Sequence, residues 1–248
     1  MVRLTKEQIE EFYEVGYVVI PGLFIGVDLQ RISRAIHGFV RTADLYRDSS
    51  DRFVYTAPPR SRLKRVVWAG TFEDRLLLAS RTDRLLRPVS QLLGHRNLVQ
   101  IINQVHLKWP NDHTFYPLHQ DSSNRRYGTE LWTDVNGKGS YVQCLTAVTE
   151  VTPSNGGLYF IPGSCKKGHL ALPYKEGVET RTDDCRIEDA VPVILNPGDT
   201  VFFGPYTIHG SGGNSSSEIQ KLFINGFALQ GANRRGYPGC GLGEDIAL

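Results

Sequence analysis

The stretch Pro117-Leu118-His119-Gln120-Asp121 decides how the rest of this sequence is interpreted. It offers an imidazole and a carboxylate two residues apart, and on an extended strand residues i and i+2 point to the same face. The two side chains could therefore reach one point in space. Two histidines and one carboxylate on one face of a metal form the arrangement that suits non-haem Fe(II), which keeps open positions for substrate and oxygen.

The third ligand must come from elsewhere, and the best candidate is His209 in Thr207-Ile208-His209-Gly210-Ser211. It lies 88 residues after Asp121 (209 − 121), a separation that suits two strands brought together by a barrel or sandwich. Spacing alone is a weak signal, since a His-x-Asp pair arises by chance in many chains and a single strand histidine usually belongs to the core or the surface. The surrounding sequence has to strengthen the assignment.

Composition limits the classes of protein and partner. The 248 residues suffice for one sizeable core and most simply form a single domain, residues 1–248. The formal net charge of +2 gives no global attraction to nucleic acid or to a membrane, so a small-molecule substrate is expected and neither of those partners is. A nucleic-acid-modifying enzyme would be expected to carry a basic stripe, whereas the basic residues here are scattered. The oligomeric state is left open.

The N-terminus and the cysteines indicate the cellular compartment. The first residues are charged and do not form a signal peptide, and no apolar run approaches the ~20 residues that span a bilayer. The cysteines contain no Cys-x-x-Cys pair, so free thiols in a reducing compartment are expected instead of a zinc site or a disulfide. They are Cys144, Cys165, Cys185 and Cys240. We therefore expect a cytoplasmic protein.

The first part of the chain has the pattern of helices. Thr5 and Gln8 form a capping box for a helix that ends at Gly16, and a strand is expected at residues 17–20. A second helix is expected at about 27–46, and residues 66–93 are expected to be mostly helical, with Pro88 at a break or in a first turn. Residues 47–66 are polar and basic, which indicates a solvated loop or a cover that favours an anionic substrate.

From about residue 98 the hydrophobic period changes to that of strands. Short strands are expected at 98–107, 141–149, 157–161, 191–195, 200–203 and 219–229, separated by turns such as Pro162-Gly163 and Asn196-Pro197-Gly198-Asp199. Many short strands between Gly and Pro turns are typical of a sandwich or a double-sheet jelly roll. The fold class is therefore expected to be α+β, with a jelly-roll core and N-terminal helices packed on it.

Five segments carry a further resemblance. They are Gln8-x-x-x-Phe12-x-x-x-Gly16-Tyr17-Val18-Val19-Ile20, His119-Gln120-Asp121, Asn155-Gly156-Gly157-Leu158-x-x-Ile161-Pro162-Gly163-Ser164, Pro197-Gly198-Asp199 and His209-Gly210-Ser211-Gly212-x-Asn214. Together and in this order they resemble the phytanoyl-CoA dioxygenase family of Fe(II)/2-oxoglutarate-dependent oxygenases. Each segment alone is modest, but five in the right order are specific, and they span nearly the whole chain.

The resemblance implies a double-stranded β-helix and Fe(II), 2-oxoglutarate and O2 as cofactor and cosubstrates. His119, Asp121 and His209 become the implied iron ligands. The implied reaction converts 2-oxoglutarate and O2 to succinate and CO2 while a small organic molecule, in our interpretation a specialised metabolite, is oxidised, most simply by hydroxylation. Related halogenases carry a small residue where this chain has Asp121, so the resemblance favours oxygenation.

The sequence departs from the family at one important position. Members usually bind the distal carboxylate of 2-oxoglutarate with an arginine eleven residues after the last histidine, and residue 220 here is Gln220. A guanidinium offers a charged fork, whereas an amide is neutral. Lys221 follows, but adjacent strand residues face opposite sides unless a bulge turns one inward. Ser211 and Thr146 match positions that commonly help to hold the cosubstrate.

Three readings of this departure stay open. Gln220 or Lys221 still holds 2-oxoglutarate, the cosubstrate is altered, or the chain is a jelly-roll metal-binding module without oxygenase activity. Of the other polar residues, His106 and His113 do not fit the matched pattern and are interpreted as packing or surface residues. Arg125 and Arg126, in a long insertion at 122–139, are candidates for meeting an anionic substrate.

Overall fold

The computed structural model describes residues 2–47, 51–57, 61–173, 175, 178–180 and 182–248. One set of strands comprises β1 (Tyr17–Ile20), β2 (Phe53–Tyr55), β3 (Leu63–Val67), β4 (Asn97–Lys108), β6 (Tyr141–Ala147), β9 (Thr200–Phe203), β11 (Gln220–Leu229) and β12 (Glu244–Ala247). A second set comprises β5 (Tyr116–His119), β7 (Leu158–Phe160), β8 (Val191–Val193) and β10 (His209–Ser211). The helices are α1 (Lys6–Val15), α2 (Gly26–Thr42), α3 (Asp74–Ser80), α4 (Asp83–Leu93) and α5 (Asp121–Asn124), with 3-10 turns η1 (Ala43–Tyr46), η2 (Ala69–Thr71), η3 (Ser164–Lys167) and η4 (Ile187–Asp189).

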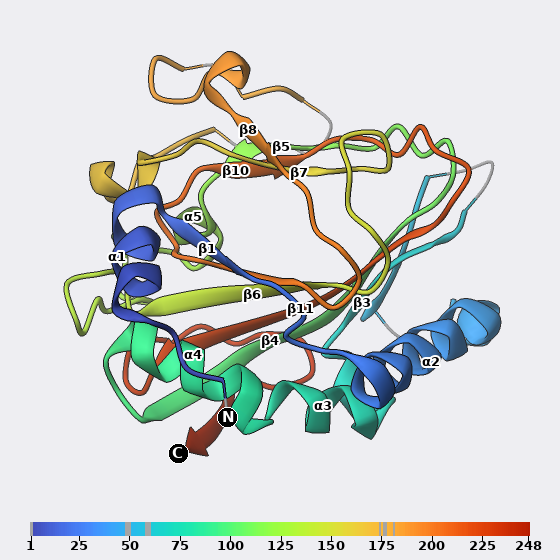
Figure 1. The fold of residues 1–248 in the computed structure, drawn as a ribbon, viewed down its shortest axis with the longest axis horizontal. Coiled ribbons are helices and arrows are strands. Elements are labelled where there is room, and N and C mark those ends of the chain that lie inside the picture. The colour runs from blue at the N-terminus through green and yellow to red at the C-terminus, as the bar shows by residue number, and fades with distance from the viewer. Residues whose placement is uncertain (1, 48–50, 58–60, 174, 176–177, 181) are drawn as a thin grey trace.

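Within the described residues the strands form two antiparallel sheets. The large sheet has eight strands in the order β1-β9-β6-β11-β4-β3-β2, with β12 also paired to β4, and the small sheet has the order β5-β10-β7-β8. The small sheet lies across from β6, β11 and β4, and α3 and α4 lie on the far side of those strands (Figure 1). The expected α+β class, with a jelly-roll core and packed N-terminal helices, is confirmed.

The N-terminal elements follow the local sequence closely. Thr5 and Gln8 form the expected capping box, and Gly16 ends α1 in the left-handed conformation with φ of 102°. The second helix stops at Thr42 and continues as η1, so its last turn is tighter than expected. Pro88 neither breaks nor begins a helix, because it lies inside α4. It is buried there, and packing of the helix offsets the hydrogen bond that proline cannot donate.

The expectation of a loop at residues 47–66 was wrong in part. Strand β2 pairs with β3, and β3 pairs with β4, so this segment extends the large sheet. Leu63 and Val66 are fully buried, but Lys64 and Arg65 between them hide the strand pattern in a polar run. Residues 58–60 of the expected cover, including Pro58, Pro59 and Arg60, lie outside the described residues.

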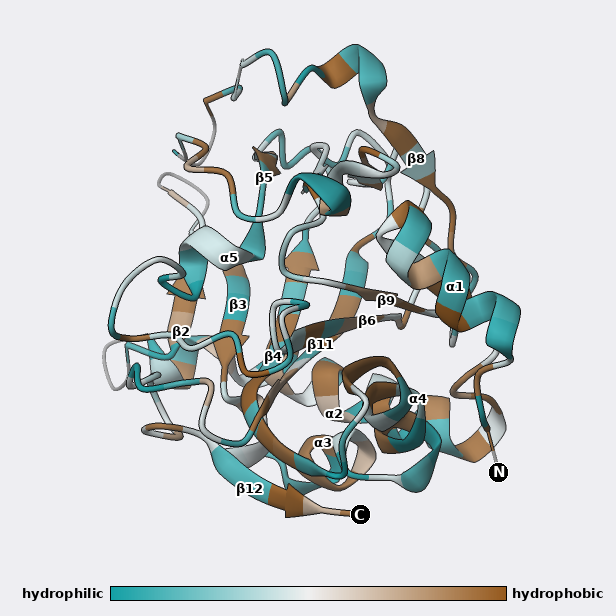
Figure 2. Cartoon of the chain, turned by 90° about the vertical axis from the view of Figure 1, so that its left-hand side faces the viewer, coloured by the Kyte–Doolittle hydropathy of each residue, from teal (hydrophilic) through white to brown (hydrophobic). Residues whose placement is uncertain are grey.

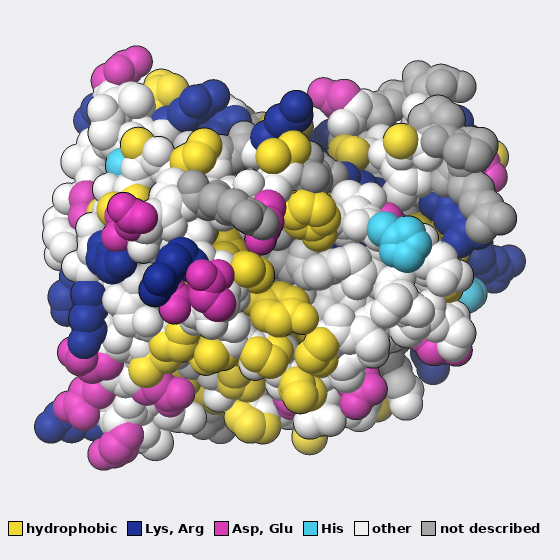
Figure 3. All heavy atoms as spheres, turned by 90° about the horizontal axis from the view of Figure 1, so that it is seen from above, with side chains coloured by type: hydrophobic (Ala, Val, Ile, Leu, Met, Phe, Trp, Pro, Cys, Tyr) yellow, Lys and Arg dark blue, Asp and Glu magenta, His cyan; other side chains and the backbone are white. Residues whose placement is uncertain are grey.

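The hydrophobic core lies between the sheets and under the helices. One buried cluster runs from Leu4 to Tyr237 and includes side chains of both sheets and of α1 to α4. Strands β6 and β9 are mostly hydrophobic, whereas α5 is hydrophilic (Figure 2). On the side of the small sheet, hydrophobic side chains also gather in the middle of the surface (Figure 3). None of the described helices has both the length and the apolar composition to cross a membrane.

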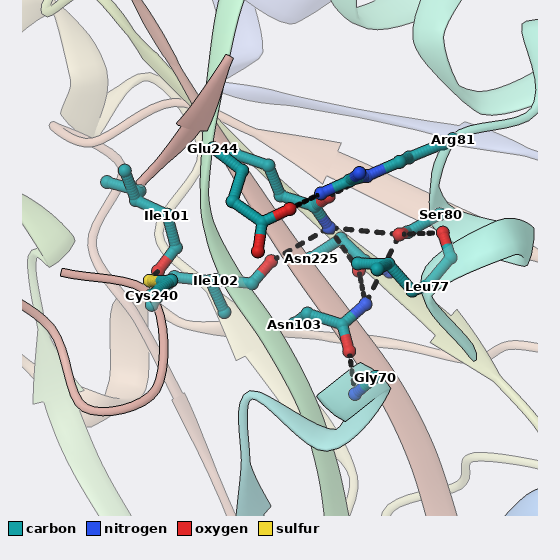
Figure 4. A network of polar contacts seen from close by, with 11 residues as sticks. Gly70, Leu77, Ser80, Arg81, Ile101, Ile102, Asn103, Asn225, Cys240 and Glu244 are labelled. Carbon is teal, nitrogen blue, oxygen red and sulfur yellow. Dashed lines mark hydrogen bonds and ion pairs between the residues drawn. The ribbon is translucent and has the colours of Figure 1, made fainter. Parts of the chain in front are cut away.

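A buried polar network joins the large sheet to α3 and η2 (Figure 4). Asn103 on β4 and Asn225 on β11 are direct cross-strand partners, and the Asn103 amide donates to Asn225 Oδ1 at 3.0 Å. The same amide donates to Ser80 Oγ at 3.2 Å, and Asn103 Oδ1 accepts from the Gly70 N–H at 2.8 Å. These bonds fix the large sheet on its helical support.

Candidate metal centre

The two histidines and the carboxylate that the sequence singled out meet at the edge of the small sheet. His119 ends β5, His209 begins β10, and the antiparallel register places these two residues directly opposite each other. Asp121 was expected on the same strand as His119, but it is the first residue of α5. The change of direction at Gln120 therefore orients the Asp121 carboxylate toward the two histidines. The candidate ligand atoms of the three residues all lie within 4.8 Å of one another.

Backbone carbonyls orient both imidazoles. His119 Nδ1 lies 2.8 Å from the Pro117 carbonyl oxygen, and His209 Nδ1 lies 2.9 Å from that of Thr207. A carbonyl only accepts, so each Nδ1 carries the proton and each Nε2 carries a lone pair, the form that binds a metal. Burial, followed by the charge of His209, lowers the pKa of His119 to about 4, so His119 is neutral near pH 7.

The carboxylate of Asp121 is buried and incompletely satisfied. Within the described residues, Asp121 Oδ2 has no hydrogen-bond partner. Burial by itself would raise the pKa of Asp121, but the charge of Arg125, and then those of the two histidines when they are protonated, outweigh it and hold the pKa below its usual value. An ionised oxygen without a donor beside two imidazole lone pairs fits a divalent cation, and this donor set suits Fe(II).

A cavity of about 460 Å³ opens beside these three residues. Ser211 and Gln220, two of the expected cosubstrate residues, line it. Lys221 and Thr146 are not among its described lining residues. The Thr146 hydroxyl instead pairs with the Thr200 hydroxyl at 2.8 Å, and Lys221 follows Gln220 on β11, where its side chain takes the opposite face.

Lys108 at the end of β4 is a cavity residue that the sequence did not reveal. It is the direct cross-strand partner of Gln220, and its side chain is only 6% exposed. Lys108 Nζ donates to Ser211 Oγ at 2.7 Å and also to the carbonyl oxygen of Gly212. A cation therefore lies beside the position where the family usually has an arginine. Only the β4–β11 register shows this, and the sequence does not display that register.

Gly156 makes room for this arrangement. Its φ is 98°, and a Cβ there would lie 2.5 Å from Lys108 Cδ, so a larger residue would displace the lysine. The Gly156 carbonyl accepts from Gln220 Nε2 at 2.9 Å, which orients the amide, while Gln220 Oε1 has no partner within the described residues. The turn in the segment Asn155-Gly156-Gly157 thus shapes this end of the cavity.

The remaining polar candidates lie in different places. His106, interpreted from sequence as a packing or surface residue, lines the cavity, whereas His113 is exposed outside it. Arg125 is buried and lines the cavity, and Arg126 is exposed. The insertion at 122–139 is packed in its middle, where the stacked rings of Tyr127 and Trp132 lie 4.9 Å apart.

The chain is similar in sequence to proteins named as dioxygenases. A dioxygenase, andF, of Emericella variicolor is 32% identical over 125 residues, which are 50% of this chain and 38% of that protein. Human peroxisomal phytanoyl-CoA dioxygenase is 27% identical over 242 residues, covering 91% of this chain and 68% of that protein.

The fold is similar to that of a solved structure. The crystal structure of the epimerase SnoN in complex with Fe3+, alpha-ketoglutarate and nogalamycin RO superimposes with a TM-score of 0.72 at 20% identity and covers 98% of this chain and 94% of that one. The sequence profile of phytanoyl-CoA dioxygenase (PhyH) matches residues 12–222. The chain therefore belongs to the phytanoyl-CoA dioxygenase family of Fe(II)/2-oxoglutarate-dependent dioxygenases.

Proposed function

We propose that this chain binds Fe(II) through His119, Asp121 and His209 and uses 2-oxoglutarate and O2 to hydroxylate a small organic molecule. The observation that carries the proposal is the convergence of the three ligand atoms within 4.8 Å beside a cavity of about 460 Å³. With the iron bound, O2 and 2-oxoglutarate yield succinate and CO2, and one oxygen atom enters a C–H bond of the substrate. A specialised metabolite is our proposed substrate type.

Lys108, Ser211 and Gln220 are the proposed partners of the distal carboxylate of 2-oxoglutarate. The ammonium of Lys108 supplies the charge that Gln220 lacks, and the Ser211 hydroxyl, 2.7 Å from it, supplies a second donor. All three donors would bond to an ionised carboxylate, but only the lysine adds an opposite charge, so we expect the lysine to dominate this interaction. Lys221 and Thr146 are less suited, because they are not among the described residues that line the cavity.

The first test is an anaerobic titration of the metal-free protein with Fe(II) and then with 2-oxoglutarate. We expect the visible charge-transfer band of an iron-chelated keto acid, and we expect succinate after oxygen is added. His119→Ala and His209→Ala should each lose metal binding and the band, while His113→Ala, at an exposed histidine outside the cavity, should keep both.

The alternative is a metal-binding jelly roll with an altered cosubstrate or without oxygenase activity, which the neutral residue at 220 favours. In that case iron binds but 2-oxoglutarate produces no band and no succinate. The same outcome would contradict our proposal.

Two broader proposals complete the assignment. One large buried cluster, from Leu4 to Tyr237, supports one domain over residues 1–248. All four cysteines are free, which agrees with a reducing compartment and supports a cytoplasmic location.

A further inference from the structure

A buried arginine lies at the end of the cavity away from Lys108. Arg125, just after α5, is 7% exposed and lines the cavity. Its Nη2 donates to the Tyr141 hydroxyl at 3.0 Å and, more weakly, to Gln143 Oε1 at 3.5 Å. The Nε atom of Arg125 is also buried, and it has no hydrogen-bond partner within the described residues. The guanidinium therefore bonds to uncharged acceptors and retains an unused donor.

Two tyrosine rings enclose this guanidinium. Arg125 Cζ lies 4.9 Å from the centre of the Tyr141 ring and 5.5 Å from that of the Tyr237 ring. The Tyr237 hydroxyl is a second buried group without a partner in the described part of the chain. Arg235, another residue of the cavity wall, has its Cζ 5.1 Å from the Tyr237 ring. Two unused donors, the Arg125 Nε–H and the Tyr237 hydroxyl, thus lie on two neighbouring side chains.

The sheet is shaped to admit this cluster. A Cβ at Gly226 would lie 2.2 Å from the Tyr141 hydroxyl oxygen, so only glycine lets that hydroxyl lie against β11. Gly226 pairs with Gln143 across β11 and β6, whereas Gln220 pairs with Lys108. Six residues of an extended strand separate the two positions, about 20 Å at ~3.3 Å per residue. The arginine end is therefore distinct from the end assigned to the cosubstrate.

The candidate metal centre lies close to the arginine end. Phe203 pairs with Gln143 in the large sheet, and its ring centre is 4.5 Å from that of His209. Asp121 is four residues before Arg125, and the backbone carbonyl oxygen of Asp121 accepts a hydrogen bond from the backbone N–H of Arg125 at 2.9 Å. A small molecule bound by the arginine would thus extend toward the candidate metal centre.

The sum of the charges around the cavity indicates the sign of the charge that such a molecule carries. A divalent metal, the Asp121 carboxylate, the two carboxylates of 2-oxoglutarate and the Lys108 ammonium together sum to zero. Arg125, whose charge also acts on Asp121, then leaves this buried region with a net positive charge, and such a charge is costly unless an opposite charge balances it. The cavity wall also carries the positive charges of Arg65, Lys108 and Lys64. After burial, these charges lower the pKa of His106.

We infer that Arg125 and Tyr237 bind an oxyanion of the substrate, so that the molecule oxidised by this protein carries a carboxylate, phosphonate or phosphate group. The inference rests on the proposed function, because it assigns the substrate class of the same cavity. Oxyanions accept hydrogen bonds in several directions, which matches the unused Nε–H and O–H donors.

The test uses the full chain with Fe(II) and saturating 2-oxoglutarate, kept anaerobic. Calorimetric titration compares hexanoate and hexylphosphonate with the neutral hexanamide. We expect the anions to bind at least about tenfold more tightly, since a hydrogen bond to a charged group contributes about 1.5–3 kcal/mol. Arg125→Gln should remove this preference, Tyr237→Phe should reduce it severalfold, and Arg126→Gln, at the exposed neighbour, should leave it unchanged.

The charge-transfer band separates the possible failures. An intact band in Arg125→Gln together with lost anion preference supports the inference. Equal binding of all three probes by the wild type, or an anion preference kept by Arg125→Gln, would overturn it. Loss of the band in Arg125→Gln would overturn it too, because the arginine would then act through Asp121. A wild type without the band contradicts the proposed function instead, and the anion preference is then measured on the metal-free protein.

Discussion

At the scale of single residues, Lys108 on β4 supplies the positive charge that the family usually has at position 220 of β11, where this chain has Gln220. The two are cross-strand partners, and Lys108 contacts Ser211 at 2.7 Å. We expect Lys108→Met to weaken 2-oxoglutarate binding by about ten- to a hundredfold, since the lost hydrogen bonds involve a charged donor. Gln220→Arg added to Lys108→Met should restore part of the affinity.

The measurement for this pair is the 2-oxoglutarate dependence of the charge-transfer band at fixed Fe(II). Lys221→Met, on the opposite face of the same strand, is the matched control and should bind the cosubstrate normally. An unchanged dissociation constant in Lys108→Met would mean that another group holds the distal carboxylate.

His106 carries a residue-scale prediction about pH. Burial, and then the charge of Arg65, holds the pKa of His106 well below its ordinary value of 6.5. Below pH 6.5 the imidazole of the unfolded chain is protonated, whereas that of the folded protein stays neutral. Protonation therefore favours the unfolded state, and the free energy of unfolding falls as the pH decreases from about 7 to about 5. The contribution of one such group is at most about 1.4 kcal/mol per pH unit.

Urea unfolding at the two pH values measures this effect. The His106→Gln variant should lose less stability between them than the wild type, and His113→Gln, at an exposed histidine, should lose as much as the wild type. Parallel losses in all three proteins would refute the assignment to His106.

At the scale of elements, the polar network beneath the large sheet is expected to contribute strongly to stability. Asn103→Ala removes the acceptor of the buried Gly70 N–H and a donor to Asn225 and Ser80. We expect a loss of about 1–3 kcal/mol in the free energy of unfolding, the usual effect of unsatisfied buried groups. Chemical denaturation measures it, with Asn97→Ala, exposed on the same strand, as the control. Equal stability of the two variants would argue against the network.

The elements also show how far sequence reasoning reaches. The capping box of α1, the strand after it and the short strands of the second half follow from local periodicity and turn residues, and all occur in the structure. Strand β3 was missed because Lys64 and Arg65 interrupt its apolar pattern, and β2 because its three residues are a short run within a polar and basic segment. Asp121 was placed on a strand because the change from strand to helix at Gln120 has no local signal.

Contacts between distant strands were the least accessible part. The histidines were found because their residue types are distinctive, whereas Lys108 resembles any lysine that ends a strand. Its importance depends on the register between β4 and β11, which many cross-strand contacts fix together. Arg125 was a candidate from sequence, but its burial between Tyr141 and Tyr237 depends on a residue more than a hundred positions away.

At the scale of the whole molecule, the candidate ligands divide between the two sheets. His119 and His209 lie on the small sheet and Asp121 directly follows it, whereas Lys108 and Gln220 lie on the large sheet. A metal alone would therefore bind residues only on the small-sheet side of the cavity. When 2-oxoglutarate also binds, it would contact the metal on that side and Lys108 on the large sheet, and so connect both sheets. Binding to the folded state alone stabilises it by about 2.7 kcal/mol at a ligand concentration a hundred times the dissociation constant.

We therefore expect Mn(II), which resists oxidation, to raise the melting temperature, and 2-oxoglutarate to raise it again only when Mn(II) is present. Each step should reach about 5–10 °C near saturation, because 1 kcal/mol shifts the melting temperature of a protein of this size by about 2–4 °C. Lys108→Met should keep the step caused by Mn(II) and lose most of the step caused by 2-oxoglutarate, and His209→Ala should lose both. Scanning calorimetry measures the steps. If 2-oxoglutarate stabilised Lys108→Met as much as the wild type, it would not connect the sheets through this lysine.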